Sequence, residues 1–86
     1  MICHICGKPA SDMHHIFGGS NRKNSEKHRL KVPLCRECHD KIHFKDRELM
    51  DKLHVYGQRL FNTLYPQLDF RAIFRTNYLD DYKETL

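Results

Sequence analysis

The first 45 residues alternate short apolar clusters with polar segments. Apolar side chains cluster over 13–17, and 30–34 alternates apolar and polar positions, so each segment predicts a short strand. Pro33 places the second strand at an edge or near its own end. The polar, basic segment 20–29 between them predicts a loop. A helix is expected to begin near Arg36.

The second half has the spacing of amphipathic helices. Asp46 is a suitable N-cap for a helix over 46–65, which Pro66 stops. The apolar residues of this helix form one stripe: Leu49, Met50, Leu53, Leu60, Phe61 and Leu64. A shorter helix is expected over 69–77, and the polar tail 78–86 is expected to fray.

Composition makes this small chain depend on a cross-link or a ligand for stability. It has 86 residues, of which 40% are hydrophobic and 30% charged, so its apolar core is small. Four Cys and seven His stand out. The net charge of +4 is unevenly spread, because residues 1–45 hold nine Lys and Arg against four Asp and Glu. A polyanionic partner is therefore favoured for the first half.

Two further patterns bear on location. No apolar run approaches the roughly 18 residues needed to span a bilayer, so we expect no membrane contact. The N-terminal segment lacks the basic and apolar regions of a secretory signal. We therefore expect a cytoplasmic protein, in which paired cysteines bind metal more often than they form disulfides.

Two Cys-x-x-Cys pairs are the strongest chemical signal. Cys3 and Cys6 form the first pair, Cys35 and Cys38 form the second, and 28 residues separate them. Each pair can hold one side of a tetrahedral Zn²⁺, so together they predict a structural zinc site with four cysteine ligands. Zinc binding would stabilise the core directly. A turn, a hairpin and a helix joined by one zinc form a treble clef, so we expect a small α+β fold.

Other interpretations of the cysteines stay open. They could be four independent buried side chains, or His4 or His39 could replace one Cys ligand. The pairs could also serve as a redox or metal-sensing switch. The paired spacing favours the structural zinc site over each alternative.

Four histidines form a second candidate site. His14 and His15 end the first predicted strand, whereas His39 and His43 are four residues apart on the predicted helix. Residues at that spacing lie on one helix face, where two imidazoles can bind one metal ion. Either pair alone is common on protein surfaces. Their joint occurrence beside a predicted zinc site favours a second metal.

The chain resembles the HNH endonucleases, the ββα-metal family, in several short motifs within residues 1–45. The motifs are Asp12-Met13-His14-His15-Ile16, then Gly18-Gly19, then Pro33-Leu34-Cys35-x-x-Cys38-His39-x-x-x-His43. The chain is most similar to the zinc-stapled phage and bacterial branch that includes phage recombination-enhancement nucleases. The resemblance implies a zinc-stapled, treble-clef-like ββα core over 1–45. We expect 46–86 to form a two-helix C-terminal extension packed on this core in a single compact domain.

The resemblance implies metal-dependent hydrolysis of DNA phosphodiester bonds. His14 and His39 match the family's metal ligands, and His43 matches the position that completes or supports coordination. The metal would be Mg²⁺, Mn²⁺, Ni²⁺ or Zn²⁺. His15 matches the general base that takes a proton from the attacking water. Near neutral pH, a neutral imidazole is suited to that role.

The chain departs from the family at the Asn that orients the general base. Leu30 occupies its usual place, and the nearest polar candidates are His28, Asn24 and Asn21. Some members of the related branch also lack the Asn and keep a polar residue at the place of His28. We therefore assign the orienting role to His28.

A set of basic residues lies between the two histidine pairs. It consists of Arg22, Lys23, Lys27, Arg29 and Lys31. These side chains could follow a phosphate backbone, which gives affinity without base specificity. The alternative is an ordinary solvated loop. A phage or bacterial recombination or packaging protein is a further candidate partner.

A second function class fits the same residues. A catalytically silent zinc module with four cysteine ligands could bind DNA or a protein partner, but it would not need the four histidines. Asp12 could support a metal ligand from outside the coordination shell, although a solvated turn residue is the simpler interpretation. His4 and His54 are expected to have no role in the site.

Overall fold

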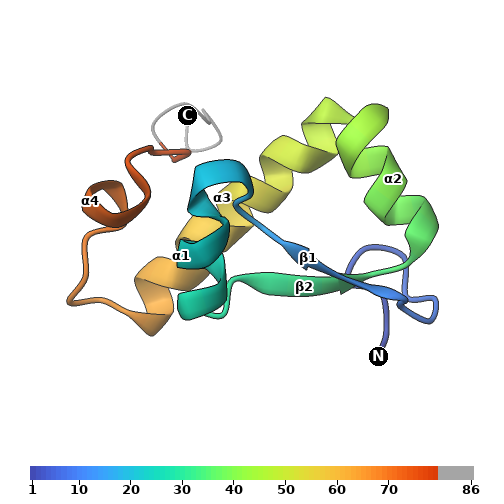
Figure 1. The fold of residues 1–86 in the computed structure, drawn as a ribbon, viewed down its shortest axis with the longest axis horizontal. Coiled ribbons are helices and arrows are strands. Elements are labelled where there is room, and N and C mark those ends of the chain that lie inside the picture. The colour runs from blue at the N-terminus through green and yellow to red at the C-terminus, as the bar shows by residue number, and fades with distance from the viewer. Residues whose placement is uncertain (80–86) are drawn as a thin grey trace.

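The computed structural model describes residues 1–79, which form a two-stranded hairpin and four α-helices. The strands β1 (Asp12–His15) and β2 (Lys31–Leu34) pair antiparallel. In their register, His15 lies opposite Lys31 and His14 opposite Val32. The expected small α+β fold is thus confirmed, with the hairpin at its centre (Figure 1).

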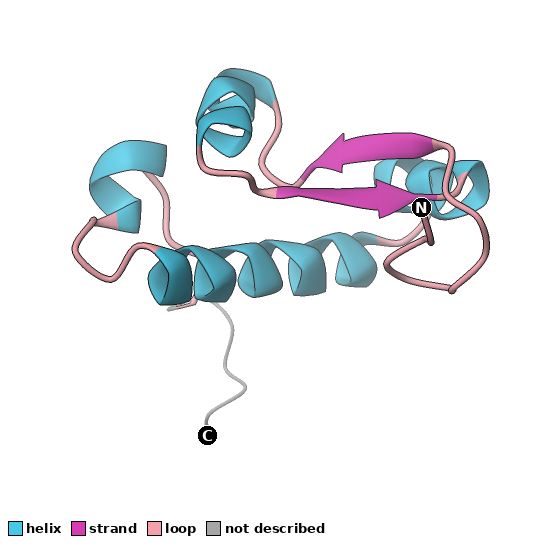
Figure 2. Ribbon diagram, turned by 90° about the horizontal axis from the view of Figure 1, so that it is seen from below, coloured by secondary structure: helices cyan, strands magenta, loops and turns pink. Residues whose placement is uncertain are grey.

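Three helices follow the hairpin. α2 (Arg36–Phe44) begins directly after β2, and α3 (Arg47–Leu64) runs along one side of the hairpin (Figure 2). The predicted cap is present, because Asp46 Oδ1 accepts a hydrogen bond from the Leu49 backbone N–H at 2.9 Å. α4 (Phe70–Phe74) is shorter than expected, since Arg75 adopts a left-handed conformation with φ 59° and ends the helix. Of the expected tail, 80–86 lie outside the described residues.

The predicted loop over 20–29 is wrong, because this segment contains a 3-10 turn, η1 (Gly19–Asn21), and a helix, α1 (Arg22–Lys27). Ser25 explains the difference. Its buried hydroxyl donates to the Phe17 carbonyl at 2.7 Å and accepts from the Phe17 N–H at 3.0 Å. Contacts with distant residues thus stabilise α1, although the polar composition of this segment did not indicate a helix.

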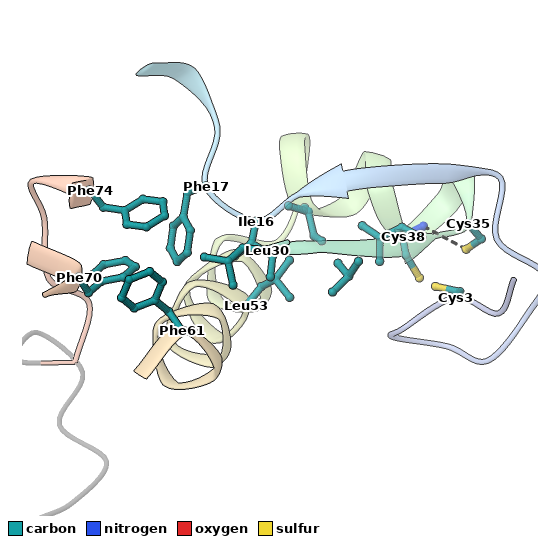
Figure 3. Close-up of a cluster of buried hydrophobic side chains, with 13 residues drawn as sticks. Cys3, Ile16, Phe17, Leu30, Cys35, Cys38, Leu53, Phe61, Phe70 and Phe74 are labelled. Carbon is teal, nitrogen blue, oxygen red and sulfur yellow. Dashed lines mark hydrogen bonds between the residues drawn. The ribbon is translucent and has the colours of Figure 1, made fainter. Parts of the chain in front are cut away.

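One apolar core joins the two halves of the described chain (Figure 3). Phe17, just after β1, contacts Phe70 and Phe74 with ring centroids 5.2 and 5.0 Å away. Gly57 lets α3 approach this strand closely, because a Cβ at this position would lie 2.6 Å from Ile16 Cγ2. The long helix therefore packs directly against the segment that follows His14 and His15. None of the helices over 1–79 has the length and apolar character to cross a membrane.

Candidate functional site

The four cysteines lie together at one end of the hairpin. Cys3 and Cys6 come from an N-terminal turn, in which Gly7 has φ +80°, a conformation that favours glycine. The turn is attached to β2 by a 2.8 Å hydrogen bond from the His4 N–H to the Pro33 carbonyl. The second pair comes from the start of α2, and the four Sγ atoms lie within 4.8 Å of one another. This confirms that the two pairs form one cluster that could hold a metal ion.

The cysteine cluster favours the ionised form of one sulfur and disfavours that of another. Burial raises the pKa of Cys3, but backbone N–H groups of Cys6, Cys35 and Ile5 outweigh it and lower the pKa to about 6. Burial is the main cause that raises the pKa of Cys38, to about 12. Four thiol groups at one point, one of them readily ionised, are a fitting donor set for Zn²⁺.

Three histidines form a second cluster. His14 comes from β1, and His39 and His43 come from one face of α2. One nitrogen of each lies within 4.8 Å of the others. The centroid of the His14 ring is 5.2 Å from that of His39 and 5.5 Å from that of His43. The structure therefore brings together all three histidines predicted to bind the second metal.

His14 has a free ring nitrogen and a lowered pKa, which are the properties of a metal ligand. Its Nε2 is buried and has no hydrogen-bond partner within residues 1–79, which is costly for a polar atom. Burial, followed by the charges of His39 and His43, lowers the pKa of His14 to about 4, so the ring is neutral at pH 7. A neutral imidazole with an unpaired buried nitrogen fits a divalent metal ion.

Asp12 supports this cluster from β1. Its Oδ2 lies 2.9 Å from His39 Nδ1, and Arg36 approaches the other carboxylate oxygen at 3.4 Å. The hydrogen bond with His39 is the main cause that lowers the pKa of Asp12. The ionised carboxylate accepts the Nδ1 proton, so Nε2 of His39 is left as the ligand atom. Asp12 is therefore a strand residue beside the cluster, and the simpler expectation of a solvated turn residue is wrong.

His15 has a partner that sequence reasoning missed. Its Nε2 lies 2.7 Å from Glu26 Oε2, and Lys31 Nζ lies 3.0 Å from Glu26 Oε1. Hydrogen bonds from Lys31 and then from His15 are the main causes that lower the pKa of Glu26, so the carboxylate is ionised. Glu26 reaches His15 because residues 22–27 form a helix beside β1. The spacing of residues along the sequence does not indicate this contact.

The structure places His28 in the aromatic core. Its Nδ1 lies 2.9 Å from the Asn24 carbonyl oxygen, and its ring packs against Phe61 and Tyr65. His15, in contrast, contacts Glu26. The structure thus does not join His28 to the residue that it was expected to orient.

An open hollow of about 300 Å³ lies over the histidine cluster. Besides the cluster, His15, Arg22, Met50 and His54 line it. His54 was expected to have no role, yet it forms part of this wall and stacks on Phe17, with ring centroids 5.4 Å apart. Of the five basic residues, Arg22 reaches the hollow, and Lys31 is paired with Glu26. Three others are exposed on or next to α1: Lys23, Lys27 and Arg29.

Comparison with known proteins places the chain in a family. An uncharacterized protein of Escherichia coli strain K12, YdfU, is 39% identical over 75 residues, which cover 85% of this chain and 19% of YdfU. The chain thus spans about a fifth of the length of this relative. No solved structure matches it. A family model described as "Protein of unknown function (DUF968)" matches residues 1–71, which include both clusters. The chain therefore belongs to the DUF968 family.

Proposed function

We propose that this protein is a metal-dependent endonuclease of the HNH type that hydrolyses DNA phosphodiester bonds. One observation carries the proposal: His14, His39 and His43 each place a ring nitrogen within 4.8 Å of the others, and the buried Nε2 of His14 has no hydrogen-bond partner within residues 1–79. His15 follows His14 on the same strand. A structural zinc module needs neither the second cluster nor its supporting carboxylates. The second cluster therefore favours a metal-dependent catalytic centre over a module with structural zinc alone.

In this proposal, His14, His39 and His43 hold the second metal. Imidazole nitrogens suit Zn²⁺ and Ni²⁺, and Mn²⁺ and Mg²⁺ are further candidates if substrate oxygens complete their coordination. When bound, this metal would supply Lewis acidity toward the phosphate and the leaving oxygen. Asp12 keeps His39 in the tautomer that presents Nε2 to the cluster.

His15 acts as the general base. The Glu26 carboxylate accepts the proton on His15 Nε2, so Nδ1 carries the lone pair that takes the proton of the attacking water. Glu26 thereby performs the orienting role for which sequence reasoning chose His28. Lys31 holds the other oxygen of Glu26 and fixes the carboxylate in place.

The cysteine cluster provides the structural zinc site in the proposal. Cys35 caps α2 through its Sγ, which accepts a hydrogen bond from the Cys38 N–H at 3.4 Å. Zinc at this point would therefore fix the start of the helix that carries His39 and His43. This arrangement of hairpin, helix and zinc corresponds to a treble-clef-like ββα core.

DNA is the proposed substrate because a basic residue, Arg22, lines the histidine hollow and further basic residues follow it on α1. Arg22 lines the hollow together with Gly18 and Gly19, and Lys23 and Lys27 extend the positive charge along α1. Such residues contact phosphates and give affinity that falls steeply with salt. They do not read bases, so the proposal includes no sequence preference.

A plasmid-cleavage assay tests the proposal. We expect the zinc-loaded protein to cleave supercoiled DNA when Mg²⁺, Mn²⁺, Ni²⁺ or Zn²⁺ is added and to stop when the added metal is chelated. His15→Ala should lower the rate by about a hundredfold or more, whereas His4→Ala should not change it. DNA binding without cleavage at any metal would instead favour the catalytically silent zinc module. Equal cleavage by His15→Ala would disprove the assigned base.

A further inference from the structure

A second hollow adjoins the histidine hollow, and residues from the end of α2 and the start of α3 line it. Its volume is about 490 Å³. Three residues line both hollows: His43, Met50 and His54. A group bound in the second hollow would therefore lie directly beside a substrate bound at the histidine cluster.

Phe44 forms part of the second hollow and is unusually exposed. It ends α2 with 80% of its surface accessible, and its ring centroid lies 6.0 Å from that of His43. A phenyl ring exposed to this extent adds little to the core. It offers a flat apolar face next to the proposed metal ligands.

The charges around the second hollow favour an uncharged occupant. Lys45 and Arg47 line it, but so do Asp46 and Asp51, so the formal charges cancel. Asp46 is already engaged as the cap of α3. A phosphate would gain little net attraction here. The wall combines the aromatic ring of Phe44, side chains of both charge signs and the imidazole of His54. A flat, neutral group with polar edges could stack on the ring and form hydrogen bonds with the polar side chains.

We propose that Phe44 stacks on an unpaired nucleobase next to the phosphate bound at the histidine hollow, so that the preferred substrate is DNA with a locally unpaired base. This inference rests on the proposed function and specifies its substrate class. In an intact duplex, neighbouring base pairs cover both faces of each base. A base must therefore leave the stack before it can lie on Phe44, and unpaired bases do so at the lowest cost.

Binding to two oligonucleotide duplexes tests this inference. They share one sequence, but in one a 2-aminopurine is unpaired and in the other it is paired. The zinc-loaded His15→Ala protein serves as parent, because it should bind without cutting. We expect tighter binding and stronger 2-aminopurine quenching with the unpaired probe. Phe44→Ala should weaken that binding about fivefold or more and abolish the preference for the unpaired base.

Three further variants separate stacking from other effects. Phe44→Trp should keep the preference, whereas Phe44→Leu, which keeps an apolar side chain without a π-face, should lose the quenching. Leu64→Ala removes another exposed apolar side chain, at the far end of α3, and should bind as the parent does.

Several outcomes would overturn the inference. Unchanged binding and quenching by Phe44→Ala, or equal weakening for both probes, would show that Phe44 does not recognise an unpaired base. A change confined to self-association would assign Phe44 to a protein interface. If the parent bound neither probe, the proposed function would fail together with the inference. If it bound both equally, the inference alone would fail.

Discussion

Asp12 and His39 meet across 27 residues of sequence, with Asp12 Oδ2 2.9 Å from His39 Nδ1. This contact joins β1 to α2 at the histidine cluster. It engages Nδ1 of His39 and leaves Nε2 available to a metal ion. A metal-ligating imidazole that is held by a carboxylate in this way keeps both its orientation and its basicity.

Loss of this contact should weaken the second metal site alone. We expect Asp12→Ala to lower the affinity of the histidine cluster for Mn²⁺ or Zn²⁺ by about ten- to a hundredfold, while zinc at the cysteines stays bound. Calorimetric titration of the zinc-loaded protein measures this. Arg36→Gln is the matched control, because Arg36 contacts the same carboxylate from an exposed position. Equal affinity in Asp12→Ala and the parent protein would contradict the assigned role.

Glu26 should affect catalysis through the orientation of His15. Glu26→Ala removes the 2.7 Å contact, and we expect kcat for DNA cleavage to fall about ten- to a hundredfold with little change in KM. Glu26→Gln keeps an acceptor oxygen and should retain more activity than Glu26→Ala. Steady-state kinetics on a nicked-product assay measures both. The role is wrong if the two variants lose equal activity, or if KM alone changes.

The sequence predicted the residues whose roles depend on local spacing. Both Cys-x-x-Cys pairs and the i, i+4 pair His39 and His43 could be assigned because a turn or a helix fixes their geometry within a few residues. Leu53 and Phe61 of the predicted stripe are buried for the same reason, because helical spacing places them on one face of α3. The prediction was wrong for Leu64, which is 51% exposed, and it left out the buried Val55 and Gln58.

The roles of Glu26, His28 and His54 depend on packing between distant segments. α1 is stabilised by Ser25 bonded to Phe17 and by Asn24 Nδ2 bonded to the Ile73 carbonyl at 3.2 Å. Neither contact has a local signature, so the segment resembled a solvated loop and Glu26 was overlooked. His28 is polar, yet an aromatic cage buries it, which residue type alone does not reveal.

Zinc bound at the cysteine cluster should be required for folding. Cys38→Ser removes the buried sulfur of α2, and we expect loss of zinc and of cooperative thermal unfolding measured by circular dichroism. Treatment of the parent protein with a strong chelator should have the same effect. Lys8→Ala, an exposed change on the same turn, is the control. A cooperative, zinc-free Cys38→Ser protein would show that zinc is not needed for folding.

Gly57 should be required for the packing of α3 on the end of β1. An alanine Cβ would come within 3 Å of Ile16 Cγ2 and the Phe17 ring, so we expect Gly57→Ala to destabilise the protein by about 1–3 kcal/mol despite its higher helix propensity. Thermal unfolding measures this. Gly18→Ala is the control, because a Cβ there meets no atom within 4 Å and φ is −97°. A stability gain in Gly57→Ala would contradict the packing.

Protonation of His54 should oppose folding. Burial holds the pKa of His54 below its usual 6.5, against the raising effects of Asp51 and the Ile16 backbone. The unfolded chain thus binds the proton more readily, and stability is lost as pH falls below about 6.5. We expect the urea midpoint to drop between pH 7.5 and 5.5, and to drop less in His54→Gln. His4→Gln should match the parent, and an unchanged slope in His54→Gln would contradict the burial effect.

The binding of one metal ion by His14, His39 and His43 can be tested most directly by anomalous diffraction from crystals soaked in Mn²⁺. We expect two separate metal peaks, zinc among the four cysteine sulfurs and manganese beside His14 Nε2, His39 and His43. His14→Ala crystals should lose the manganese peak and keep the zinc peak. A single peak at the cysteines, with the histidine cluster empty at saturating Mn²⁺, Ni²⁺ and Zn²⁺, would contradict the proposed catalytic centre.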